Sequence, residues 1–225
     1  LFFVGLYLRA ESVSPALHHD YSMRLLQLRE ADATVNAEVL ANQVAVSRNY
    51  DMLNAQIAVS RQRVAQLAQV PGYLPDAERA AMRRAVADLD RTLAEKHAGV
   101  DAFRRSNSVL KNSLTYFSST AEAFLAARRE GAVKRLVEAY VRQVLYFART
   151  PGEDRRAPVE AAEARMRVAA EHSVARPVVE NLALHGQIVL KHATEVDALV
   201  HAILSLDSGT RLNTLGQRYL SAHDE

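Results

Sequence analysis

Six polar residues on or beside apolar helical seams have the chemistry to hold a small polar ligand. They are Arg48, Tyr50, Lys96, His97, His185 and His192. When the segments that carry them are laid antiparallel, the rise of an α-helix places all six at similar heights. Cations and hydrogen-bond donors that face the core of a helical bundle form this kind of site. We therefore predict a ligand site at this level. The alternative is that each residue only sets the register of its helix.

A second set of polar residues falls near the middle of the predicted bundle. It comprises Asp32, Asn36, Asn107 and Asn112. The set lies at the height of the chain break at Pro151-Gly152, where one packed region would give way to another. An unpaired buried polar group costs about 1–3 kcal/mol, so such residues need partners on other helices. We predict that they form a layer that couples two bundles.

The sequence carries no recognisable catalytic or metal-binding pattern. It has no Cys, which excludes thiol catalysis, disulfides and zinc-cysteine sites. It also lacks a phosphate-binding glycine loop, a Gly-x-Ser-x-Gly elbow and a His-Glu-x-x-His motif. His18 and His19 are adjacent and would point about 100° apart on a helix, and His185 and His192 would lie about 10 Å apart. We expect no catalytic residue, no metal and no cofactor in this chain.

Glycine and proline divide the chain into long segments. No Gly or Pro occurs between Ala16 and Val70, and only Gly99 interrupts the stretch from Asp76 to Glu130. Because Gly and Pro are the strongest signals for the ends of helices, each uninterrupted stretch predicts one helix. The predicted segments are 16–70, 76–130, 132–149, 158–173 and 177–206, with a last piece that continues past Ser208-Gly209 to the C-terminus.

Composition and segment lengths predict an all-α fold. The 225 residues include 8 Gly and 6 Pro, too few for a sandwich or barrel with many turns, and no segment alternates as a strand would. The matched lengths predict an elongated antiparallel helical rod of two stacked four-helix bundles that share long helices. The membrane-proximal bundle would comprise about 16–44, 105–149 and 197–225. The membrane-distal bundle would comprise about 45–104 and 156–196.

The N-terminal residues indicate where the chain lies relative to a membrane. Leu1 to Leu8 carry no charge, and Tyr7 and Arg9 follow the pattern of a membrane interface. We predict that residues 1–9 end a transmembrane helix and that residues 10–225 lie outside the cytoplasm. An ordinary hydrophobic N-terminal segment is the alternative.

The net charge is only +2, from 28 Lys and Arg against 26 Asp and Glu. This balance argues against nucleic acid as a partner.

Three blocks of sequence, taken in order, resemble a family of bacterial sensor domains. They are Leu28–Leu40 followed by Ser47–Asp51, then Phe103–Phe117, then Leu182–Leu190 followed by Glu195–Val200. The blocks are similar to the double all-helical ligand-binding (DAHL) domain of bacterial sensor histidine kinases. Their order and spacing also resemble the periplasmic region of VirA-like sensor kinases. None of the blocks is a catalytic motif, and the resemblance spans nearly the whole chain.

The resemblance implies a periplasmic input domain of a dimeric sensor histidine kinase in the inner membrane. Its expected partner is a small molecule or a periplasmic sugar-binding protein, and its expected signal is a displacement of helices. Two other interpretations remain open. The chain could be the helical bimodular input domain of a chemoreceptor, or it could be a structural or adaptor bundle that binds no ligand.

Overall fold

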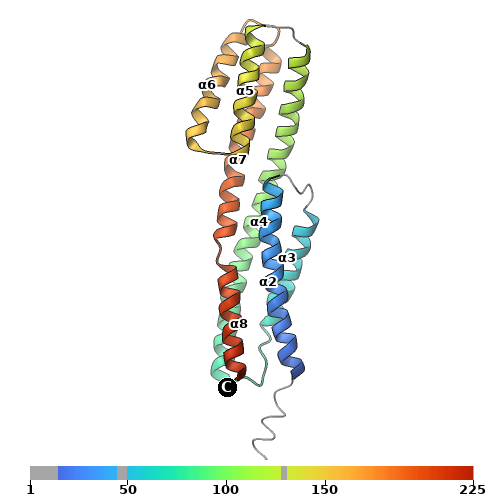
Figure 1. The fold of residues 1–225 in the computed structure, drawn as a ribbon, viewed down its shortest axis with the longest axis vertical. Helices are drawn as coiled ribbons and strands as arrows, with labels where there is room; N and C mark the ends of the chain where they lie inside the picture. The colour runs from blue at the N-terminus through green and yellow to red at the C-terminus, as the bar shows by residue number, and fades with distance from the viewer. Residues whose placement is uncertain (1–14, 45–49, 128–130, 225) are drawn as a thin grey trace, which may run out of the picture. The chain divides into compact units, whose positions relative to one another are not determined.

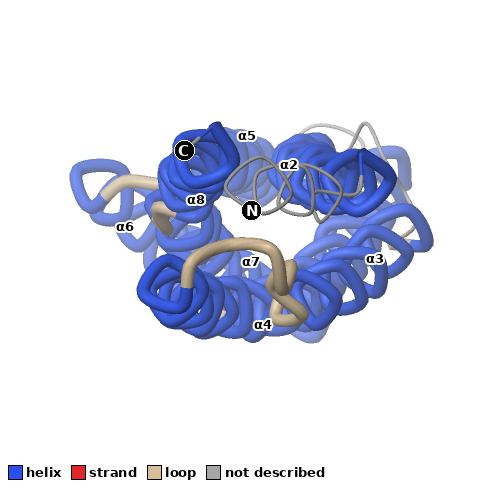
Figure 2. Tube along the Cα trace, turned by 90° about the horizontal axis from the view of Figure 1, so that it is seen from below, coloured by secondary structure: helices blue, strands red, loops and turns tan. Residues whose placement is uncertain are grey.

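A computed structural model describes residues 15–44, 50–127 and 131–224 of the chain (Figure 1). These residues form seven helices and no strand. The tube trace in Figure 2 accordingly shows helix and loop colours alone for the described residues. The helices are α2 (Pro15–Gln43), α3 (Asp51–Leu67), α4 (Asp76–Ala127), α5 (Ala132–Arg149), α6 (Glu153–Ala170), α7 (Arg176–Ser205) and α8 (Ser208–Asp224). The predicted all-α class is therefore confirmed. The predicted membrane segment at residues 1–9 lies outside the described residues.

Several helix boundaries fall where the sequence predicts them. Helix α5 spans Ala132–Arg149, between Gly131 and the Thr150-Pro151 break. Helix α6 begins at Glu153 instead of Pro158, so this predicted start was wrong. Glu153 and Asp154 occupy its first turn, where negative charge is favourable. Pro158 lies inside the helix and removes only one backbone N–H donor there.

The predicted single helix over 16–70 is wrong. Helix α2 ends at Gln43, α3 begins at Asp51, and the two helices pack against each other. Neither Gly nor Pro marks the break. Each helix buries an apolar stripe, with Leu28 and Val35 on α2 and with Leu53 and Ile57 on α3. Because burial of such stripes contributes more than helix propensity, two packed helices replace one long exposed helix.

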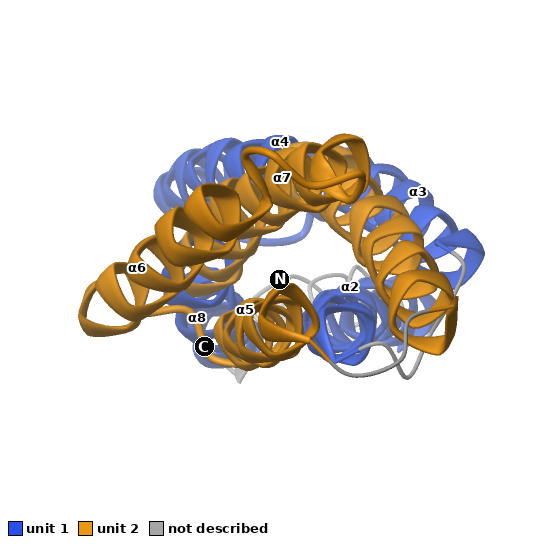
Figure 3. Ribbon diagram, turned by 90° about the horizontal axis from the view of Figure 1, so that it is seen from above, with its two compact units in different colours: residues 1–100, 202–225 blue, residues 101–201 orange. Residues whose placement is uncertain are grey.

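The described residues divide into two compact units, which Figure 3 colours separately. Unit 1 comprises residues 1–100 and 202–225, and unit 2 comprises residues 101–201. This grouping differs from the predicted bundles, which joined 16–44 to 105–149 and 45–104 to 156–196. The difference follows from the break after Gln43, because α3 and the first half of α4 then join α2 in unit 1. Helices α4 and α7 each contribute residues to both units.

Unit 1 is a four-helix arrangement of α2, α3, the first half of α4, and α8. All four helices contribute to one apolar core. Its members include Leu28 of α2, Val64 of α3, Leu89 of α4 and Leu215 of α8. Helix α2 also packs directly against α8. Burial of this core is the main source of stability for the unit.

Unit 2 contains the second half of α4 with α5, α6 and α7. Helices α5 and α6 form a packed pair. Tyr140 of α5 is fully buried, its ring lies edge-on to Phe117, and its hydroxyl reaches the carbonyl of Ala183 at 3.5 Å. A Cβ atom at Gly186 would overlap the Tyr140 hydroxyl and lie 2.8 Å from the ring carbon Cζ. Glycine is therefore required at this position by the close approach of α5 and α7.

Within residues 15–44, 50–127 and 131–224, no helix is both long enough and apolar enough to cross a bilayer.

Candidate functional site

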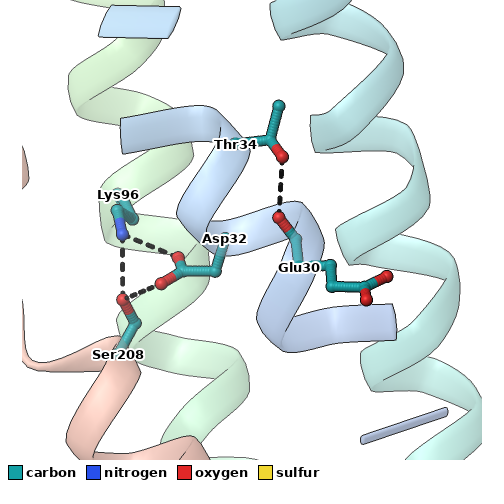
Figure 4. Close-up of polar contacts among 5 residues, drawn as sticks. All are labelled: Glu30, Asp32, Thr34, Lys96 and Ser208. Atoms are coloured by element: carbon teal, nitrogen blue, oxygen red, sulfur yellow. Dashed lines mark hydrogen bonds and ion pairs between the residues drawn. The ribbon is translucent and has the colours of Figure 1, made fainter. Parts of the chain in front are cut away.

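Three buried side chains from three helices form a closed ring of hydrogen bonds in unit 1 (Figure 4). The Lys96 ammonium of α4 donates to Asp32 Oδ1 of α2 at 2.6 Å and to Ser208 Oγ of α8 at 2.9 Å. The Ser208 hydroxyl in turn donates to Asp32 Oδ2 at 2.8 Å. Each pair of residues in the ring is thus directly bonded. We call Asp32, Lys96 and Ser208 the buried triad.

The buried triad is almost completely shielded from water. The Lys96 side chain is 1% exposed and the Asp32 side chain is 6% exposed. Taking two such charges out of water is costly, and the cost is recovered only when the pair is close and its remaining hydrogen bonds are made. Ser208 supplies these bonds, because it accepts from the ammonium and donates to the second carboxylate oxygen. Loss of any one of the three residues would therefore leave a buried charge without part of its hydrogen bonding.

The position of Ser208 gives the triad its structural meaning. Helix α7 ends at Ser205 and α8 begins at Ser208, so Ser208 lies directly after the break between these helices. The triad ties the start of α8 to α2 and α4. Polar groups in a helical core can fix the register of the helices that carry them. A shift of α8 along α2 and α4 would withdraw the Ser208 hydroxyl and leave the buried Lys96–Asp32 pair without the hydrogen bonds that Ser208 supplies.

A second polar cluster lies in unit 2, around His192 of α7. Its Nδ1 atom lies 2.9 Å from Ser106 Oγ and 3.1 Å from Glu195 Oε2, and the Ser106 hydroxyl donates to Glu195 at 3.0 Å. A hydrolytic triad needs its carboxylate on one imidazole nitrogen and its serine on the other. Here both groups lie at Nδ1, so His192 cannot relay a proton between them. The cluster links α4 to α7.

His185 has a different environment from His192, although both lie on α7. The His185 ring packs on the ring of Tyr116, with 4.4 Å between centroids. The Asn181 amide donates to the Tyr116 hydroxyl at 3.3 Å. The Nδ1 atom of His185 and the Oδ1 atom of Asn181 are buried and have no hydrogen-bond partner. This cluster is therefore incompletely satisfied, in contrast to the buried triad.

The six predicted ligand residues are divided between the two units. Tyr50, Lys96 and His97 belong to unit 1, His185 and His192 belong to unit 2, and Arg48 lies outside the described residues. Within unit 2, His185 and His192 face different partners. The predicted common height depended on a continuous helix over 16–70, which the structure does not contain. Lys96 instead meets Asp32, a member of the other predicted set.

The predicted coupling residues are also divided. Asp32 and Asn36 belong to unit 1, and Asn107 and Asn112 belong to unit 2. Asn107 is buried, whereas Asn112 is exposed. The sequence reasoning missed Ser208, Ser106 and Glu195. For Ser208 the available signal was its place at a helix break, where a hydroxyl can bond to neighbouring helices as well as to the backbone.

Unit 1 also has a groove between α2 and α8, with a volume of about 390 Å³. Leu25 and Leu26 of α2 and Leu220 of α8 line it, and Gly216 leaves space in it. Polar groups at the groove come from Ser22, Arg29, Asn213 and Gln217. None of the triad residues lines this groove. The groove and the triad therefore both involve α2 and α8, but they consist of different residues.

Aromatic and imidazole rings fill unit 1 where α2 begins and α8 ends. The rings of His18 and His223 are stacked, with 3.8 Å between centroids. The Tyr219 hydroxyl lies 2.6 Å from the Tyr73 hydroxyl and 3.0 Å from His18 Nδ1. Burial raises the pKa of Tyr219 far above its usual range, and the bond to Tyr73 acts in the same direction. Tyr219 therefore stays neutral and serves as a buried hydrogen-bonding group.

Metal-ligating side chains do not gather in the part of the chain that the structure describes. No group of three or more His, Cys, Asp or Glu residues there could hold a metal ion. The stacked pair of His18 and His223 is therefore interpreted as part of the packing of α2 against α8.

Comparison with known proteins assigns the chain to a family. The DAHL domain matches residues 13–225, which is nearly the whole chain. No curated protein and no solved structure matches it. The match covers α2 to α8 and therefore both units. The chain belongs to the DAHL domain family, a sensor domain family of histidine kinases.

Proposed function

We propose that the chain is the extracytoplasmic ligand-sensing input domain of a transmembrane sensor histidine kinase. In this proposal the kinase is a homodimer in the inner membrane, and the described helices lie in the periplasm. The DAHL match over residues 13–225 supports a sensory role. The seven described helices supply the elements that a signal would displace. The chain's own task is to bind a signal and pass it on, with phosphoryl transfer left to a separate kinase module.

The observation that carries this proposal is the buried triad. Lys96 connects Asp32 of α2 to Ser208 at the start of α8, so the position of α8 depends on the contacts of α2 and α4. A sensor must convert a change in binding into a change in helix position. Packed interfaces usually have discrete arrangements, and shifts of about 1–2 Å between them are typical of helix signalling. The triad stabilises one such arrangement of α8.

Ligand binding shifts this equilibrium only if the ligand prefers one arrangement. A ligand that binds both arrangements equally changes nothing, however tightly it binds. The bound partner, either a small molecule or a periplasmic solute-binding protein, must therefore contact helices whose relative position changes. We propose that α2 and α8 are these helices, because they pack together and the triad joins them.

Calorimetric titration tests the proposal. The 225-residue chain would be titrated with a periplasmic sugar-binding protein in its sugar-loaded form and, separately, in its sugar-free form. Binding of the loaded form alone is the expected result for an indirect sugar sensor. A thermal-shift screen of the same chain against small metabolites covers direct sensing, because a ligand that binds only the folded state raises its melting temperature.

A negative result in both experiments would contradict the proposal. If neither form of the sugar-binding protein bound and no metabolite raised the melting temperature, the chain would be a structural or adaptor bundle. The variant Asn112→Ala serves as a control, because the side chain is exposed and should change neither binding nor stability.

A further inference from the structure

We propose that the groove between α2 and α8 binds a small organic monocarboxylate with an apolar body. This inference rests on the proposed sensory function and adds a place and a chemical class for a directly bound ligand. The groove has a volume of about 390 Å³, which lies within the usual range for small-molecule sites of about 300–1,000 Å³. It lies wholly within unit 1.

The groove has an apolar wall that suits the body of such a ligand. Leu25 and Leu26 of α2 face it from one side, and Leu212 and Leu220 of α8 face it from the other. Leu26 and Leu220 are large apolar residues that are about half exposed. A ligand with an alkyl or cycloalkyl body would remove this surface from water.

The polar groups of the groove select a negative charge. The exposed Arg29 guanidinium lines the groove, and no carboxylate of the described residues forms an ion pair with it. Within the part of the chain that the structure describes, the Arg29 guanidinium donates a long hydrogen bond of 3.5 Å to Asn213 Oδ1. Ser22 adds a hydroxyl to the lining of the groove. A carboxylate at Arg29 would form the charge-assisted bond that the free chain lacks.

Gly216 lines the groove and contributes no side chain to it. It lies in the interior of α8, where glycine is less favourable than alanine. No atom lies within 4 Å of a Cβ atom built on it, so no neighbour requires glycine there. This contrasts with Gly186, whose missing side chain makes room for Tyr140. At Gly216 the missing side chain leaves space in the groove.

Occupation of the groove would act on the same two helices as the buried triad. A monocarboxylate bound to Arg29 of α2 and to the leucines of α8 would favour one arrangement of the two helices. The ligand would then change the position of α8 by its preference for that arrangement.

Octanoate is the probe that tests the proposal, with octanol as the uncharged control. Nuclear magnetic resonance of the isotope-labelled 225-residue chain would follow amide shifts during titration. We expect saturable shifts that centre on Asn213, Gly216 and Gln217, with octanol binding about tenfold more weakly. The variant Arg29→Gln should reduce octanoate affinity by about tenfold and leave octanol affinity unchanged, because one charge-assisted hydrogen bond is lost.

Two glycine variants make the location of the site falsifiable. Gly216→Leu should fill the groove and abolish octanoate binding while the chain stays folded. Gly209→Leu is the matched control, because Gly209 is exposed in the first turn of α8, also has open space, and does not line the groove. It should leave octanoate affinity unchanged.

Three results would overturn the proposal. These are equal affinity for octanoate and octanol, octanoate binding that survives Gly216→Leu, and no saturable binding by hexanoate, octanoate or cyclohexanecarboxylate. Self-association of the chain through the groove, detected by sedimentation and undisturbed by octanoate, would assign the groove to a second copy instead. None of these results would affect the titration with sugar-binding protein, so the two proposals fail separately.

Discussion

In unit 1 the Lys96 side chain is 1% exposed and all three members of its cluster bond to one another. In unit 2 the cluster around His192 is also formed by three residues, but Glu195 is 48% exposed. Water can replace a lost partner in the second cluster and cannot do so in the first. The same number of contacts therefore has different energetic weight in the two units, because the cost of a lost polar contact depends on burial.

The largest effect is expected from Lys96→Met. This variant leaves the Asp32 carboxylate buried without its cation and should lower the free energy of unfolding by about 3–5 kcal/mol. Urea denaturation measures the change. The triple variant Lys96→Met, Asp32→Leu and Ser208→Ala should recover most of the loss, because no charge then remains buried.

An exposed ion pair on the same helix gives the matched control for Lys96. Arg91 and Asp88 of α4 are paired at the surface, and Arg91→Met should change the free energy of unfolding by at most about 1 kcal/mol. If Lys96→Met lowered the free energy of unfolding no more than Arg91→Met does, the buried triad would contribute no more stability than an exposed ion pair. The proposed effect of burial on the two clusters would then be wrong.

Two glycines, one in each unit, give the next prediction. Gly186→Ala in unit 2 should lower the free energy of unfolding by about 1–3 kcal/mol, because the new methyl group overlaps the Tyr140 hydroxyl. Gly216→Ala in unit 1 should raise it by about 0.5–1 kcal/mol, because the site is open and alanine favours the helix. Thermal denaturation compares the two variants. The two changes in the free energy of unfolding should have opposite signs. Equal losses of stability would show that the open space at Gly216 is filled in solution.

Two serine variants compare the loss of a buried polar contact with the loss of a partly exposed one. Ser208→Ala removes a partner from both Lys96 and Asp32 and should cost about 1–3 kcal/mol. Ser106→Ala should cost about 0.5–1.5 kcal/mol, because water can reach Glu195. Urea denaturation of both variants orders them. A larger loss for Ser106→Ala would reverse the comparison of the two units.

The smallest effect is expected at Asn112. The side chain is exposed, so Asn112→Ala should change the free energy of unfolding by at most about 0.5 kcal/mol. Asn107 is buried in the same helix, so Asn107→Ala should be more destabilising. If the two variants cost the same, burial would not distinguish these predicted coupling residues.

The sequence predicts the fold class and several boundaries, because Gly and Pro mark them. Gly131 and Thr150-Pro151 bracket α5, and the break at Ser208-Gly209 adjoins the start of α8. The break between α2 and α3 carries no such signal, since it depends on packing of the two helices against each other. Local propensity cannot predict a turn that tertiary burial decides.

The same missing turn explains why Lys96 contacts Asp32, a member of the other predicted set. The sequence places Lys96 and Asp32 at different heights of the predicted bundle, because a single helix over 16–70 would hold Asp32 away from Lys96. Once α3 folds back onto α2, the two charges meet. Ser208 could not be predicted as their partner, because a serine at a helix start is more often a local cap. Which polar residues meet is therefore information that only the fold supplies.

Signalling by displacement of α8 is tested most directly by the distance between α2 and α8 in the presence and absence of a signal. The chain has no Cys, so Ala33→Cys and Thr214→Cys place spin labels at two exposed sites, one on each helix. Electron paramagnetic resonance would measure the distance alone and with sugar-loaded binding protein or octanoate. If α8 is displaced on binding, the distance between the two labels should change by about 1–2 Å with the sugar-loaded binding protein or with octanoate. An unchanged distance in the presence of a ligand shown to bind would contradict signalling by displacement of α8.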